Sequence, residues 1–145
     1  QEGIERLSEV LVDKPQIPAF DTHHFNLPGM YMRKVTITKH SIVVGKIHKM
    51  AHFAIIAKGK CAVSGNDGVR GMYEAGDVIT SQAGIQRVVV ALEDCVFITF
   101  HKTNHTDLTD IYNELMESPK FDLYDANNQL KDPMLAQEKK QVINT

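Results

Sequence analysis

Residues 45–59 read GKIHKMAHFAIIAKG, a basic and polar segment that leads into five apolar residues and ends in glycine. Lys46, His48 and His52 have the same parity, so on one extended strand their side chains project to the same face. In a small barrel that face is the interior. The stretch therefore predicts a strand that brings three basic side chains into one pocket.

Similar β-rich runs surround this segment from Tyr31 to Phe100. They read YMRKVTIT, SIVVGKIH, FAIIA, KCAVS, VRGMY, DVIT, QRVVVAL and CVFITF. Residues 65–68 (GNDG) tolerate positive φ and predict a hairpin between 60–64 and 69–73, while Gly59, Gly76 and Gly84 mark further corners. Many short strands separated by turns indicate a β-sandwich or barrel.

The segments outside this region have helical or polar patterns. Apolar residues at helical spacing predict a helix over 4–12, and a second helix follows Thr106 and Asp107, which are suited to cap it. Its apolar stripe is Leu108, Ile111, Tyr112, Leu115 and Met116. We therefore expect an N-terminal helix and arm (1–22), one β-barrel (23–105), a C-terminal helix (106–118) and an extended polar tail (119–145), which another chain would hold in place.

Composition excludes several classes of function. The 145 residues carry 16 Lys+Arg against 18 Asp+Glu, so no basic field is available to bind nucleic acid. No apolar run is long enough to cross a bilayer, and the first residues lack the pattern of a signal peptide. Cys61 and Cys95 lie in apolar runs and suit buried thiols rather than a disulfide. We expect a soluble protein with no membrane partner and no direct nucleic-acid partner.

The spacing of residues 46–59 resembles the first motif of the cupin superfamily, in which two His, a Glu and a Gly occupy fixed positions. Here those positions hold Lys46, His48, His52 and Gly59. The second cupin motif ends in a His, and the matching position here is Arg87. The resemblance implies a single cupin barrel, also called a double-stranded β-helix or jelly roll, in an all-β fold with flanking helices.

A narrower resemblance is to the small cupin-like proteins encoded by tailed bacteriophages and prophages. It rests on residues 47–52 (IHKMAH), on Arg87 and on the helix after the barrel. The resemblance implies a location in the bacterial host cytoplasm or in the phage virion.

The predicted pocket permits three interpretations. His48 and His52 are the candidate metal ligands, but Lys46 and Arg87 place cations where the cupin family has ligands, so we expect no cofactor. Alternatively Lys46, His48, His52 and Arg87 bind an anionic small molecule. In the third interpretation the two His satisfy each other or nearby backbone groups, and the basic residues reach the barrel mouth or pair with Glu74, Asp77, Glu93 or Asp94.

Three functions follow from these interpretations. The first is a non-enzymatic, virion-associated assembly protein that forms a homo-oligomer through edge strands and terminal arms and contacts other phage structural proteins. The second is a binding protein for an anionic small molecule. The third is a metal-dependent cupin enzyme built on His48 and His52. No nucleophile with an adjacent base is readable, so we assign no catalytic residue.

Overall fold

The computed structural model describes residues 2–11, 20–117 and 123–132, which contain two helices and eleven strands. The helices are α1 (Glu2–Leu11) and α2 (Leu108–Leu115). The strands are β1 (Asp21–Leu27), β2 (Met30–Ile37), β3 (Ile42–Val44), β4 (Ile47–His48), β5 (His52–Lys58), β6 (Lys60–Gly65), β7 (Arg70–Glu74), β8 (Val78–Ser81), β9 (Arg87–Ala91), β10 (Cys95–Lys102) and β11 (Met116–Glu117).

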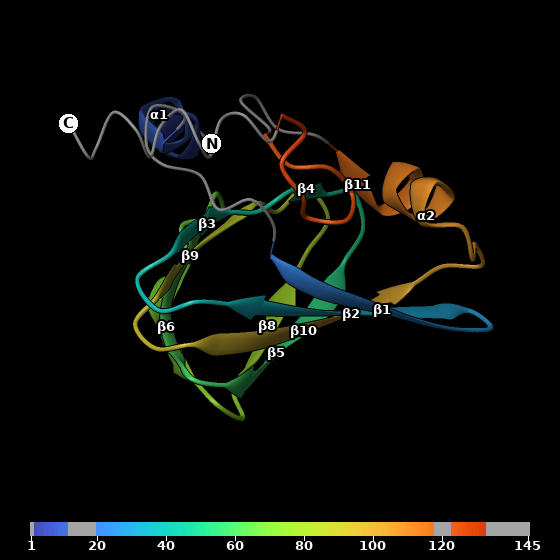
Figure 1. The fold of residues 1–145 in the computed structure, drawn as a ribbon, viewed down its shortest axis with the longest axis horizontal. Helices are drawn as coiled ribbons and strands as arrows, with labels where there is room; N and C mark the ends of the chain where they lie inside the picture. The colour runs from blue at the N-terminus through green and yellow to red at the C-terminus, as the bar shows by residue number, and fades with distance from the viewer. Residues whose placement is uncertain (1, 12–19, 118–122, 133–145) are drawn as a thin grey trace.

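The strands form two antiparallel sheets that face each other, as Figure 1 shows. One sheet has the order β1-β2-β10-β5-β8 and the other β3-β9-β6-β7, while β4 and β11 form a separate short pair. Ten buried side chains from both sheets fill the space between them, among them Ile56, Cys61, Ala91 and Cys95, each fully buried. This arrangement confirms the predicted all-β fold with flanking helices.

The corner between β5 and β6 depends on glycine. Gly59 has φ +88°, a conformation that side-chain-bearing residues rarely adopt. A Cβ placed there would lie 2.3 Å from the backbone oxygen of Asp94 and 2.9 Å from the sulfur of Cys95. The predicted hairpin is also present, because Lys60–Ser64 pair with Arg70–Glu74 and Gly68 has φ +81°.

Helix α2 is positioned at one end of the barrel. Asp107 is its N-cap, and its carboxylate accepts hydrogen bonds from the amides of Thr109 and Asp110. The helix ends at Leu115, earlier than the predicted boundary of 118, because Met116 and Glu117 pair with β4 instead. Ile111, Leu115 and Met116 pack with Tyr31 of β2 in a second buried cluster.

Two segments differ from the predicted layout. Asp21 and Thr22, predicted to belong to the arm, are the first residues of β1, which pairs along its whole length with β2. Residues 123–132 are not extended, because Tyr124 forms a β-bridge with Leu130 and the amide of Phe20 donates to the carbonyl of Asn128 at 2.9 Å. This part of the tail is held by its own chain.

The rest of the predicted arm and tail, at 12–19, 119–122 and 133–145, lies outside the described residues. Among the helices that the structure describes, none is long and apolar enough to cross a membrane.

Candidate functional site

Three histidine rings meet inside the barrel at the end nearest α2. The ring centroids of His48 and His52 are 4.1 Å apart, and those of His52 and His101 are 4.9 Å apart. His48 and His101 lie 5.6 Å apart with their ring planes only 6° from parallel. We call His48, His52 and His101 the histidine cluster.

The predicted single strand through positions 46, 48 and 52 does not form. β4 ends at His48, the chain bends at Lys49 and Met50, and β5 begins at His52. The bend is stabilised by backbone hydrogen bonds, from the amide of Lys49 to the carbonyl of Leu115 (2.8 Å) and from the amide of Gly84 to the carbonyl of His48 (2.7 Å). The prediction that His48 and His52 meet is nevertheless confirmed by their stacked rings.

His101 was not predicted to join this cluster, yet its parity on β10 places it there. Cys95 and Phe97 are buried in the core, and His101, at the same parity, is also buried. β10 pairs with β5 so that Phe100 lies opposite Phe53, which brings the next residues, His101 and His52, to the same inner face. Alternation counted from the core residues of β10 would have identified His101.

Burial and like charge keep the cluster neutral. Burial, followed by His52, His101 and Arg33, lowers the pKa of His48 well below its usual value. Burial, followed by His52 and Arg33, lowers the pKa of His101 to about 3. Burial lowers the pKa of His52 as well, with Arg87 adding to the effect and the Met50 carbonyl opposing it. Because its rings are neutral, the cluster itself carries no positive charge with which to hold an anion.

The cluster contains two buried polar atoms without partners, Nδ1 of His48 and Nδ1 of His52. An unsatisfied buried group destabilises the fold by about 1–3 kcal/mol, so a small polar molecule that reached these atoms would gain their hydrogen bonds. Neutral imidazole nitrogens are also ligands for divalent transition metals. Within the described residues, however, no three His, Cys, Asp or Glu side chains are arranged to hold an ion. The cluster therefore has ligand atoms that a metal could bind, Nδ1 of His48 and of His52, without the three-ligand arrangement of a formed metal site.

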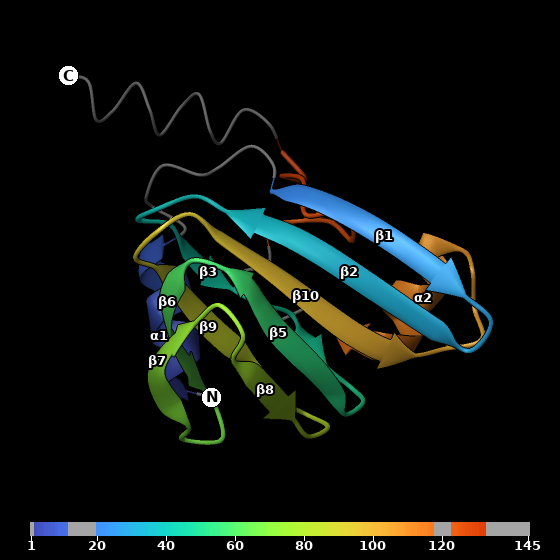
Figure 2. The same ribbon diagram turned by 90° about the horizontal axis from the view of Figure 1, so that it is seen from below.

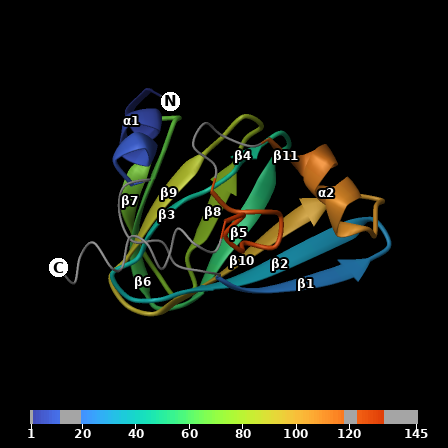
Figure 3. The ribbon, with the colours of Figure 1, turned by 45° about the horizontal axis from the view of Figure 1, so that its top comes forward.

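A polar network next to the cluster holds segment 123–132 across the end of the barrel (Figure 3). Arg33 donates through Nε to the hydroxyl of Tyr31 at 3.0 Å and through Nη2 to the carbonyl of Ala126 at 3.4 Å. His24 bridges the Tyr31 hydroxyl (2.6 Å) and the side-chain oxygen of Asn127 (2.8 Å). Arg33 and His24 are adjacent in the β1–β2 register and were not predicted as site residues.

Lys46 also helps to hold segment 123–132 across the end of the barrel. It is 7% exposed, its ammonium donates to the carbonyl of Tyr124, and it lies 5.7 Å from the centroid of the Tyr112 ring. Lys46 therefore connects the barrel to α2 and to segment 123–132. Its charged end is directed to these groups and not to the histidine cluster.

Arg87 is directed toward the turn between β6 and β7. It forms an ion pair with Asp67 at 2.9 Å, and its Nε and Nη2 donate to the hydroxyl of Ser81 at 3.3 and 3.2 Å. Burial acts to raise the pKa of Asp67, but the amide of Val69 and the charge of Arg87 lower it overall. The expected pairing of Arg87 with Glu74, Asp77, Glu93 or Asp94 was wrong, because Asp67 lies on the turn that Arg87 faces.

The four predicted site residues are thus divided. His48 and His52 are together. The charge of Arg87 acts on His52, and Arg87 also contacts Ser81, which pairs with His52 in the β5–β8 register. Lys46 lies against segment 123–132. The thiols are structural, because burial raises the pKa of Cys61 to about 12 and also raises that of Cys95.

Comparison with solved structures identifies the architecture. An RmlC-like cupin from Methanocaldococcus jannaschii, described as a double-stranded β-helix, superposes with a TM-score of 0.51 at 11% identity, over 63% of this chain and 86% of that one. An RmlC-like cupin from Shewanella frigidimarina gives 0.50 at 17% identity, over 61% and 80%. The fold is that of the cupin proteins.

A larger cupin-fold protein, salicylate 1,2-dioxygenase from Pseudoaminobacter salicylatoxidans, gives a TM-score of 0.56 at 11% identity. The match covers 79% of this chain but 33% of the dioxygenase, so this chain corresponds to a third of that enzyme. No family model matches the sequence, and no curated protein does. The cupin fold is shared, and at these identities the likeness stops at the fold.

Proposed function

We propose that this chain is a non-enzymatic cupin module that works as a homo-oligomeric structural component of a larger assembly. The observation that carries the proposal is the use of its basic side chains. Arg33 and Lys46 hold segment 123–132, and Arg87 holds the turn at Asp67. The basic side chains that could bind an anionic substrate in a cupin pocket are thus engaged in the chain's own structure.

A second feature supports association with other protein chains. Twelve large apolar side chains are exposed in the described residues. Scattered exposed apolar residues are ordinary, but several of these share one face of the five-stranded sheet, and contiguous apolar patches mark interaction sites. The phage setting, with other virion proteins as partners, is supported by the sequence resemblance at residues 47–52 and Arg87.

Native mass spectrometry and sedimentation equilibrium of the full chain test the proposal. We expect a single oligomer larger than the 16.3 kDa monomer at micromolar concentration. A monomer at about 100 μM, which corresponds to association weaker than about −5.5 kcal/mol, would refute it. Mass spectrometry of purified phage particles tests the virion setting, which requires the chain to be present in stoichiometric amounts.

Binding of an anionic small molecule by Lys46, His48, His52 and Arg87 remains a prediction. Titration calorimetry with a panel of phosphorylated and carboxylated metabolites measures it. Binding heat that is seen with the wild type and lost in Arg87→Ala would establish the site, whereas no heat with any member of the panel would refute the prediction.

A further inference from the structure

The outer face of the five-stranded sheet carries a continuous apolar row. In register, Phe25 of β1 lies opposite Met32, which lies opposite Phe100, which lies opposite Phe53, which lies opposite Thr80 of β8. The row crosses all five strands without a charged residue. The next row on the same face contains His23, Lys34, Ile98, Ile55 and Val78.

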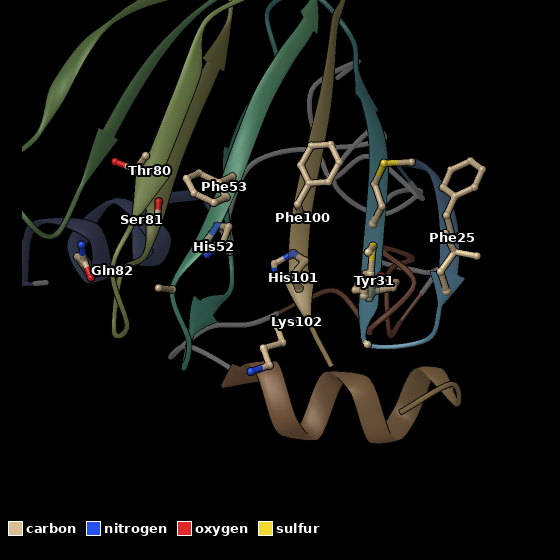
Figure 4. A pocket seen from close by; sticks show the side chains of 15 residues that line it. Phe25, Tyr31, His52, Phe53, Thr80, Ser81, Gln82, Phe100, His101 and Lys102 are labelled. Atoms are coloured by element: carbon tan, nitrogen blue, oxygen red, sulfur yellow. The ribbon is translucent and has the colours of Figure 1, made fainter. Parts of the chain in front are cut away.

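Several side chains on this face are exposed, including Phe100 and Phe53, which lie on interior strands of the sheet. Phe53 is 57% exposed, Phe25 49% and Phe100 38%, and Leu27 and Met30 at the same end reach 69% and 59%. Figure 4 shows the three phenylalanines on three strands of the sheet, with β2 between those of Phe25 and Phe100. A cavity of about 830 Å³, whose lining includes these five side chains, opens at this end of the sheet.

No described element covers this face. α2 packs on Tyr31, a buried residue whose side chain lies on the other side of the sheet from Met30 and Met32. In Figure 2 the outer surfaces of β1, β2, β10 and β5 face the viewer, and both helices lie on the far side of the sheet. We call this surface, with Phe25, Met32, Phe53 and Phe100 at its centre, the outer apolar face.

The sequence of the two central strands is also that of strands buried on both sides. β5 contains the uninterrupted apolar run 53–57, and five of the six residues at 95–100 in β10 are apolar. A strand with one solvent-exposed face alternates apolar and polar residues, whereas a strand covered on both faces is apolar throughout. β5 and β10 therefore have the composition of strands with a second layer over them.

We propose that this second layer is the same face of a second copy of the chain, forming a two-fold symmetric dimer; the proposal rests on the homo-oligomeric function proposed above. Five strands at about 4.8 Å spacing and strands about 20 Å long give a flat footprint of about 500 Å² per copy. Two copies bury about 1,000 Å², the size at which specific interfaces begin, and protruding phenylalanines add to it.

The centre of the outer apolar face carries no charge that would attract an acidic or a basic partner. The central row is uncharged, and the charged residues Lys34 and Lys102 lie on opposite sides of it, in register with Ile98 and Met30 respectively. A two-fold axis along the central row keeps the two copies of Lys34 on opposite sides of the contact and brings each near Lys102 of the other copy, so both ammonium groups must extend outward into water. The uncharged row then meets its own copy, which is the contact that an isologous dimer makes.

The test substitutes the centre of the face. Phe53→Lys places a charge in the interface, while the exposed position tolerates it in the monomer. Met72→Lys is the matched control, because Met72 is 58% exposed but lies on β7 in the other sheet. We expect the wild type and Met72→Lys to be dimers and Phe53→Lys to dissociate at least about 30-fold more readily, the size of a hot-spot loss.

Circular dichroism establishes that each variant is folded, and Phe25→Lys at the edge strand replaces Phe53→Lys if the latter does not fold. A wild-type oligomer whose mass is unchanged in the folded variant would overturn this interface while leaving the oligomeric function intact. A monomeric wild type would overturn both.

Discussion

The histidine cluster makes the stability of the fold depend on pH. The pKa of His101 is lowered from 6.5 to about 3, so His101 is neutral in the folded chain and takes up a proton on unfolding between these values. Stability is therefore complete above pH 6.5 and falls as the pH drops toward 3. At about pH 5, 1.5 units below the unfolded value, His101 alone destabilises the fold by about 2 kcal/mol.

The lowered pKa values of His48 and His52 add to this loss in the same direction. Urea unfolding followed by far-ultraviolet circular dichroism measures the effect, since the chain contains no tryptophan to report by fluorescence. The protein concentration is kept constant because dimerisation would contribute to stability.

His101→Gln isolates the titration. It lowers stability at every pH through the loss of the 2.9 Å hydrogen bond to Thr99, but we expect the difference between about pH 7.5 and pH 5 to shrink by about 2 kcal/mol relative to the wild type. His105→Gln is the control, because His105 is 48% exposed and contacts only the surface carboxylate of Glu114 among acidic groups. An unchanged pH dependence in His101→Gln would refute the assignment of His101 as a buried neutral base.

Four further outcomes follow from the structure. Purified protein should contain less than about a tenth of an equivalent of Fe, Ni, Mn or Zn by elemental analysis, and a full equivalent would contradict the geometry of the cluster. Gly59→Ala should destabilise the fold by more than about 2 kcal/mol in urea unfolding, whereas Gly84→Ala, which has the same φ of +88° and open space around it, should lose about 1 kcal/mol. A double-mutant cycle of Arg87→Ala and Asp67→Ala should give a coupling of up to about 1 kcal/mol, and zero coupling would show the pair to be incidental. Lys46→Met should speed hydrogen exchange in residues 123–132, and unchanged protection would mean that other contacts suffice to hold that segment.

Local pattern was sufficient to predict most of the barrel. The GNDG turn, the short β-rich runs and the cap at Asp107 depend on neighbouring residues, and each appears in the structure. The predictions failed where pairing with a residue distant in sequence decides the local structure. Strand β1 begins at Asp21, two residues before the predicted start of the barrel, because β2 lies beside it, and helix α2 ends early because β4 pairs with Met116.

The candidate site was predicted in part for the same reason. The spacing of His48 and His52 is local, so their meeting was predicted correctly even though the strand between them is broken. Arg87 and Lys46 have their positions fixed by the barrel but their partners fixed by Asp67 and Tyr124, which are 20 and 78 residues away in sequence. Which carboxylate or carbonyl a long basic side chain reaches is not encoded in its own segment.

The five-stranded sheet has an inverted polarity at the end nearest α2. There the inward side chains are polar, with Arg33 on β2, His101 on β10 and His52 on β5, while Phe100 and Phe53 beside them point outward. A monomer in water is stabilised by the opposite arrangement, so each face needs a compensating layer. Segment 123–132 supplies hydrogen-bond acceptors to Arg33 on the inner side. The outer side needs an apolar layer of equal extent, and a second copy of the outer apolar face provides one.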